Sequence, residues 1–171
     1  MDGLLLNTER QVWSIGEKTI AKQYGKEMTD EIIAEVIGIN NVEYRKIIKE
    51  KFGNDFPVAD FQKELNIYYE NACKSGIVSL MPGALELLNF LKEKNFYISL
   101  GTSTDRKLVE IALKKSGIFQ YFDYIVCGDE VQSRKPSPEV YLKSVEHFNL
   151  NPEECIVFED TPVGAKWRSL L

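Results

Sequence analysis

The spacing of apolar residues divides the chain into two parts, and the first part is helical. There, apolar positions recur every three or four residues, as Phe61, Leu65 and Tyr68 illustrate. Thr8 and Gln11 match the Thr-x-x-Gln capping box that opens many helices. The pattern predicts helices over residues 8–25, 29–38, 41–52 and 58–74. Four helices in succession, with no strand between them, predict a small helical bundle.

The second part alternates short apolar runs with amphipathic stretches. The apolar runs predict strands over residues 96–100, 124–128 and 155–158. The amphipathic stretches predict helices over residues 84–95, 105–116 and 138–148, and a further helix starting at Pro162. Strands that alternate with helices predict an α/β fold with a parallel sheet covered on both faces. In such sheets ligands bind beyond the carboxyl ends of the strands.

Composition narrows the class of protein. The chain has 171 residues, 44% of them hydrophobic, which suits one domain with its own core. The 26 Asp and Glu outnumber the 21 Lys and Arg, and this acidic balance argues against a nucleic-acid partner. No apolar stretch approaches the ~18 residues of a membrane-spanning helix, and the N-terminal residues lack the basic start of a secretory signal. Cys73, Cys127 and Cys155 form no Cys-x-x-Cys pair and read as reduced thiols, so we expect a cytoplasmic protein.

Chemically useful side chains follow each predicted strand. Thr102 and Ser103 offer hydroxyl and backbone N–H groups before a helix, which suits a phosphate. Lys135 precedes a stiff Pro-x-Pro segment and could neutralise charge that develops on a phosphate. Glu159 and Asp160 are adjacent acids after an apolar strand, and carboxylate oxygens are ligands that suit Mg²⁺.

Each of these residues also has an ordinary structural interpretation. Thr104 alone could cap the helix over residues 105–116, Lys135 could be a solvated loop residue, and Asp160 could cap the last helix. The combination of hydroxyl, ammonium and paired carboxylates at three strand ends is less expected by chance than any one of them. It predicts a phosphate pocket next to a Mg²⁺ site.

These motifs, in this order, resemble those of haloacid dehalogenase superfamily hydrolases that carry a helical cap. The matching segments are DGLLLNTER (2–10), Pro82-Gly83, GTST (101–104), Lys135-Pro136 and Glu159-Asp160. The resemblance implies a Rossmann-like parallel-sheet core from residues 1–10 and 77–171, with an inserted four-helix cap over residues 11–76. It further implies a phosphoric monoester hydrolase acting on a small phosphorylated metabolite.

The resemblance also implies roles for individual residues. An aspartate nucleophile attacks phosphorus and forms an aspartyl-phosphate, which water then hydrolyses. Asp2 matches the second aspartate, which protonates the leaving group and activates the water, and whose backbone carbonyl is a Mg²⁺ ligand. Thr102 and Ser103 match the groups that bind the phosphoryl oxygens, and Lys135 pairs with nucleophile and phosphate. Glu159 and Asp160 match the remaining Mg²⁺ ligands.

The chain departs from the family's pattern at both ends. In the family's pattern the nucleophile stands two positions before Asp2. That position precedes Met1, so the nucleophile is missing from residues 1–171. The central strand that carries the nucleophile is missing as well, so neighbouring strands would have unpaired edges. After Gly164-Ala165 the family continues with further strand and helix, which this sequence lacks. We therefore expect an incomplete core, a chain truncated at both ends in which Met1 is an internal methionine, and very low turnover.

Three alternatives stay open at this point. A β-phosphoglucomutase-like phosphotransferase shares the core motifs, although Asp105-Arg106 stands where the mutase pattern has Lys-Asn and so favours a phosphatase. The substrate could be a sugar phosphate or a nucleotide-type monophosphate such as pseudouridine 5′-phosphate. A non-catalytic binding relative, or a gene remnant, would also explain the missing nucleophile. The sequence predicts no oligomeric state.

Overall fold

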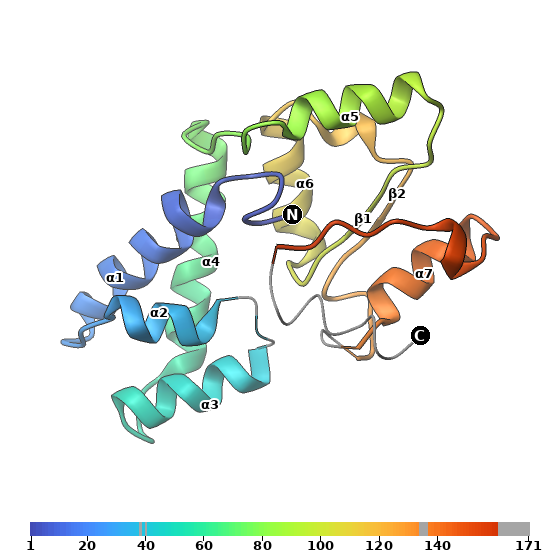
Figure 1. The fold of residues 1–171 in the computed structure, drawn as a ribbon. Helices are drawn as coiled ribbons and strands as arrows, with labels where there is room; N and C mark the ends of the chain where they lie inside the picture. Colours follow the sequence, from blue (N-terminus) through green and yellow to red (C-terminus); the bar gives the residue numbers. More distant parts are fainter. Residues whose placement is uncertain (38, 40, 134–136, 161–171) are drawn as a thin grey trace.

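A computed structural model describes residues 1–37, 39, 41–133 and 137–160. The predictions for Lys135 and for the helix at Pro162 lie outside these residues. The first part of the chain is helical, as predicted, and its helices gather on one side of the molecule (Figure 1). They are a π-helical turn η1 (Glu9–Trp13) that continues into α1 (Ser14–Gln23), then α2 (Asp30–Val36), α3 (Asn41–Phe52) and α4 (Val58–Ser75).

Two helix starts in the helical part differ in how they are capped. The Thr29 side chain accepts a hydrogen bond from the backbone N–H of Ile32 and caps α2. The capping box at Thr8 is wrong, because Thr8 has helical backbone angles and its side chain makes no capping hydrogen bond. The Gln11 amide oxygen instead accepts hydrogen bonds from the backbone N–H and the hydroxyl of Ser79. A tertiary contact therefore takes the side chain that the local motif would have used.

The second part of the chain is an α/β unit built on a short parallel sheet. Strand β1 (Ser99–Gly101) pairs with β2 (Tyr124–Val126), with Leu100 opposite Ile125. The flanking helices are α5 (Ala84–Glu93), α6 (Arg106–Lys115) and α7 (Glu139–His147), with 3₁₀ turns at Phe119–Tyr121 and Pro152–Glu154. Helix α7 packs against both strands (Figure 1). The predicted fold class, α/β with a parallel sheet and a helical cap region, is confirmed.

The prediction of a third strand over residues 155–158 is wrong. This segment is extended but pairs with neither β1 nor β2, and the described sheet has two strands. Ile156 is 82% exposed and Phe158 54% exposed, so the apolar side chains that signalled a buried strand face solvent. A strand needs a hydrogen-bonded neighbour as well as an apolar sequence, and the described residues supply none at this position.

Two hydrophobic clusters support these two parts. One lies within residues 20–65, where buried side chains of α1 to α4 surround Ile48 and Phe61. The other joins the N-terminal residues, the second half of α4 and the α/β unit, and it includes Leu6, Tyr69 and Val109. Helix α4 contributes to both clusters, so it connects them rigidly. No helix in the described part of the chain is both long and apolar enough to cross a bilayer.

Candidate active site

A cavity of about 620 Å³ lies where the two clusters meet. Asp2 and Glu9 from the N-terminal segment line it, together with Tyr44 from α3 and Thr102 after β1. Glu159 and Asp160 line the same cavity, although they are almost as far from Asp2 in sequence as the chain allows. Five of the sequence-predicted site residues therefore line one cavity: Asp2, Thr102, Ser103, Glu159 and Asp160. Lys135 lies outside the described residues.

Three hydroxyl groups hold the Asp2 carboxylate in place. Its Oδ1 atom accepts hydrogen bonds from the Thr8 hydroxyl at 2.5 Å and from the Tyr69 hydroxyl at 3.0 Å. Its Oδ2 atom accepts one from the Thr104 hydroxyl at 2.7 Å. Thr8 stands immediately before η1, Tyr69 lies in α4 and Thr104 lies in the loop after β1. The carboxylate therefore joins three parts of the chain. Such a fixed orientation suits a group that transfers a proton to a bound substrate.

The sequence did not identify these three donors. The sequence pattern gives Thr8 as part of a capping box and Thr104 as a cap of the helix over residues 105–116, and it assigns no site role to Tyr69. In the structure Asp105 occupies the N-cap position of α6, which leaves the Thr104 hydroxyl for Asp2. Tyr69 is fully buried and stacks on Trp13 with ring centroids 4.6 Å apart. The one feature that could have pointed to Tyr69 is its hydroxyl group, because a tyrosine hydroxyl needs a hydrogen-bond partner when the side chain is buried.

The loop over residues 102–104 is fixed against the end of β2. The Thr102 N–H donates to the Val126 carbonyl and the Gly128 N–H donates to the Thr104 carbonyl, each at 3.0 Å. A Cβ atom at Gly128 would lie 2.0 Å from the Ser103 carbonyl oxygen, so only glycine permits this approach. Thr102 is buried, and its hydroxyl oxygen accepts a hydrogen bond from the Thr104 N–H at 3.3 Å. The loop therefore presents its polar groups to the cavity in one arrangement.

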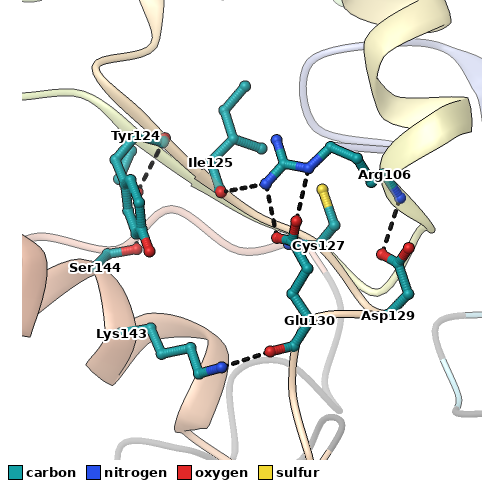
Figure 2. Close-up of polar contacts among 9 residues, drawn as sticks. Arg106, Tyr124, Ile125, Cys127, Asp129, Glu130, Lys143 and Ser144 are labelled. Atoms are coloured by element: carbon teal, nitrogen blue, oxygen red, sulfur yellow. Dashed lines mark hydrogen bonds and ion pairs between the residues drawn. The ribbon is translucent and has the colours of Figure 1, made fainter.

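Arg106 anchors the start of α6 to the loop that follows β2 (Figure 2). Its guanidinium donates two hydrogen bonds to Glu130, at 2.7 and 2.8 Å, and a third to the Ile125 carbonyl at 2.8 Å. Its backbone N–H donates to Asp129 at 2.9 Å. Glu130 also accepts from the Cys127 N–H. Arg106 is thus engaged away from the cavity, and it holds the loop and the N-terminus of α6 at the cavity's edge.

The carboxylates fit a Mg²⁺ site by chemistry, and the structure brings part of the set together. Asp160 lies against the N-terminal segment: a Cβ atom at Gly3, whose φ is 75°, would be 2.2 Å from the Asp160 Oδ2 atom. Glu159 accepts a hydrogen bond from the Tyr141 hydroxyl at 2.6 Å. Within the described residues, no three His, Cys, Asp or Glu side chains are grouped closely enough to hold a metal. The expected set has hard oxygen donors, one of them the Asp2 backbone carbonyl, and such donors suit Mg²⁺.

Two acids that line the cavity, the half-buried Glu9 and the buried Glu17, have raised pKa values. Burial, and then the charge of Asp2, raises the pKa of Glu9 to about 8. Burial raises the pKa of Glu17 to about 7, although the hydrogen bond from Tyr44 opposes this shift. Both carboxyl groups therefore hold a proton to a higher pH than an exposed glutamate does.

The raised pKa of Glu17 predicts a pH-dependent stability. Its carboxyl binds a proton more tightly in the folded chain than in the unfolded chain, so stability falls as pH rises from about 4.5 to about 7. Glu17→Gln removes this titration. We expect the loss of unfolding free energy between pH 5 and pH 7.5 to be smaller in Glu17→Gln by on the order of 2 kcal/mol. Urea unfolding at both pH values measures it, with the exposed Glu27→Gln as control. Equal slopes for all three proteins would contradict the prediction.

A family model described as "Haloacid dehalogenase-like hydrolase" matches residues 1–166. The fold agrees with this match, and the loop after β1 and the oriented Asp2 line one cavity. The chain belongs to the haloacid dehalogenase-like hydrolase family.

Individual relatives narrow the comparison further. The chain is 31% identical over 166 residues to a phosphorylated carbohydrates phosphatase of Thermotoga maritima, covering 97% of this chain and 76% of that protein. It is 31% identical over 170 residues to a "probable pseudouridine-5'-phosphatase" of Drosophila melanogaster, covering 96% and 72%. Among solved structures, a β-phosphoglucomutase of Clostridium difficile is 26% identical with a TM-score of 0.79, covering 95% and 74%. Phosphatases and a phosphoglucomutase thus both resemble this chain.

Proposed function

We propose that this chain has the site of a Mg²⁺-dependent phosphatase that acts on a small phosphorylated metabolite. The observation that carries the proposal is the Asp2 carboxylate, oriented by three hydroxyl groups at the edge of the cavity that also contains the Thr102–Ser103 loop. A carboxylate held in this way beside a phosphate-binding loop suits proton transfer to an ester oxygen. The family's relatives that act on phosphate esters support the same class of reaction.

The roles of the residues follow from their positions. Thr102 and Ser103 would bind the phosphoryl oxygens through hydroxyl and N–H groups. Asp2 would donate a proton to the departing alcohol oxygen as the ester P–O bond breaks, and later accept one from water. Glu159, Asp160 and the Asp2 carbonyl would hold Mg²⁺, which when bound neutralises charge on the phosphoryl group. Lys135 stays a predicted contact of the phosphate.

The attacking aspartate has no counterpart in residues 1–171, because no aspartate stands two positions before Asp2. We propose that residues 1–171 supply the part of the site that binds the phosphate ester and Mg²⁺. A binding experiment on the chain itself is then the appropriate test of the site.

Phosphate binding by the chain with Mg²⁺, measured by isothermal titration calorimetry, tests the proposed site. We expect Thr102→Val to weaken the binding of inorganic phosphate about 10-fold, because it removes a hydroxyl without changing shape. Thr102→Ser keeps the hydroxyl and should restore most of the affinity. Thr19→Val, which removes an exposed hydroxyl on the outer face of α1, is the matched control. Binding that is absent from the unsubstituted chain, or unchanged in Thr102→Val, would refute the proposal.

A phosphoglucomutase-like transfer is the second candidate, supported by the likeness to the Clostridium difficile enzyme. The Arg106 contacts favour the phosphatase, since this side chain is engaged with Glu130 and does not line the cavity. Product analysis of an active form with glucose 1-phosphate separates the two, because a mutase yields an isomer and a phosphatase yields free phosphate. A non-catalytic binding protein would bind phosphate and show neither product.

The substrate and the compartment are proposals of the same kind. A sugar phosphate or a nucleotide-type monophosphate fits the names of the two relatives. The cysteines Cys73, Cys127 and Cys155 are free thiols, and burial raises the pKa of Cys73 and Cys127 to about 11 and about 12. Free, unreactive thiols favour a reducing compartment, which supports a cytoplasmic location.

A further inference from the structure

One wall of the cavity is a polar stripe along the first helical segment. Glu9, Trp13, Ser14 and Glu17 all line the cavity, and they follow one another on η1 and α1. Glu9, Trp13 and Glu17 follow one another at steps of four residues, and Ser14 stands next to Trp13, so all four lie on one side of the helical segment. The stripe begins beside Asp2, where the phosphate group would bind, and continues into the cluster of α1 to α4. The far end of the stripe therefore faces the alcohol part of a bound phosphate ester.

Glu17 and Tyr44 form a buried polar pair at that far end. Glu17 is 6% exposed and Tyr44 8% exposed, yet both line the cavity. The Tyr44 hydroxyl donates a hydrogen bond to the Glu17 Oε1 atom at 3.2 Å. Among the described residues, this is the only hydrogen bond to the Glu17 carboxyl, and no fully buried polar side-chain atom there lacks a partner. The second carboxyl oxygen is therefore accessible from the cavity.

Three cationic side chains line the cavity, Arg45, Lys63 and Lys107, and none of them forms an ion pair with Glu17 among the described residues. Arg45 donates to Gln62 at 2.7 Å, and Lys107 pairs with Glu70 at 2.6 Å. A buried carboxyl with a single neutral donor is costly, and a ligand that completes its hydrogen bonds recovers part of that cost. An alcohol hydroxyl matches the second carboxyl oxygen, because it can donate a hydrogen bond to it while the Tyr44 hydroxyl keeps its own hydrogen bond to Oε1.

We infer that Glu17 and Tyr44 are a specificity-determining pair that binds a hydroxyl group on the alcohol part of the substrate. The chain would then select hydroxylated phosphate esters over apolar ones of the same size. This inference rests on the proposed function, because it takes the phosphate to bind at the Asp2 end of the stripe.

The test compares two esters of similar size that differ in their hydroxyl groups. Glucose 6-phosphate and cyclohexylmethyl phosphate are titrated with Mg²⁺ into the full chain and its variants by calorimetry. We expect Tyr44→Phe and Glu17→Leu each to weaken glucose 6-phosphate binding about 10-fold, and cyclohexylmethyl phosphate binding by less than about 2-fold. Glu17→Gln keeps a carbonyl oxygen at this position and should restore most of the selectivity. Thermal unfolding of each variant shows whether it is folded.

A matched control lies elsewhere on the same helices. Tyr24 donates a hydrogen bond to Glu64 at 2.7 Å, and neither residue lines the cavity, so Tyr24→Phe removes a Tyr–Glu pair without touching the site. It should leave the binding of both esters unchanged. If Tyr44→Phe or Glu17→Leu weakens the binding of both esters equally, or of neither, the proposed role of the pair is wrong. The proposed phosphate site is unaffected by that result. Failure of the unsubstituted chain to bind inorganic phosphate overturns the proposed function and the pair together.

Discussion

A variant with an aspartate directly before Met1, placed behind an apolar segment of about five residues, should hydrolyse phosphate esters about 10⁴-fold faster than the 171-residue chain. The added carboxylate stands two positions before Asp2. It can attack phosphorus and form an acyl phosphate, while Asp2 protonates the alcohol that leaves. Water then attacks the phosphoryl group, which releases phosphate and regenerates the carboxylate. Release of phosphate from glucose 6-phosphate with Mg²⁺ measures the gain.

The same extension with asparagine in place of the added aspartate is the control. It supplies the same apolar segment and a side chain of the same shape. The difference in rate between the two variants therefore measures the effect of the carboxylate, separately from any gain in stability that the segment brings. A second control, Asp2→Asn in the extended variant, keeps the nucleophile and removes the proton donor, and it should lose about 10²-fold or more of the gained rate. Similar rates with aspartate and asparagine would show that hydrolysis does not pass through an aspartyl-phosphate.

Phe61→Ala should destabilise the chain by about 3–5 kcal/mol. Phe61 has no exposed surface, and its ring meets those of Phe56 at 5.4 Å, Tyr24 at 6.0 Å and Phe52 at 6.4 Å between centroids. The substitution leaves a cavity in the cluster that holds α1 to α4 together. Since whole domains are stable by only about 5–15 kcal/mol, a loss of this size is a large share of the total. Urea denaturation followed by circular dichroism measures it.

Phe96→Ala is the matched control, because Phe96 is 55% exposed and its removal leaves no internal cavity. Its cost should stay below about 1 kcal/mol. Comparable losses in the two variants would mean that the four helices do not depend on the aromatic cluster around Phe61. Inorganic phosphate binding by the Phe61→Ala chain, where it is still folded, should persist because Thr102 and Ser103 belong to the other part.

Helices with strong periodicity could be predicted closely. Residues 41–52 were predicted as a helix and form α3 with the same bounds, and α4 extends one residue beyond its predicted end to a left-handed Gly76. In these segments the apolar spacing and the terminal residues agree, so local preferences suffice. The segment 155–158 has an equally clear apolar run and yet forms no strand, because pairing depends on another segment of the chain.

The site shows the same division between local pattern and distant contact. The sequence by itself determined which types of residue are available to the site, since the motifs at Asp2, Thr102 and Asp160 are local patterns. Only the tertiary structure decided that Thr8 and Tyr69 orient Asp2, and that Glu17 and Tyr44 meet in a buried cavity wall. The physical reason is that a hydroxyl hydrogen bond depends on a separation of about 3 Å, which residues 67 positions apart reach only after packing.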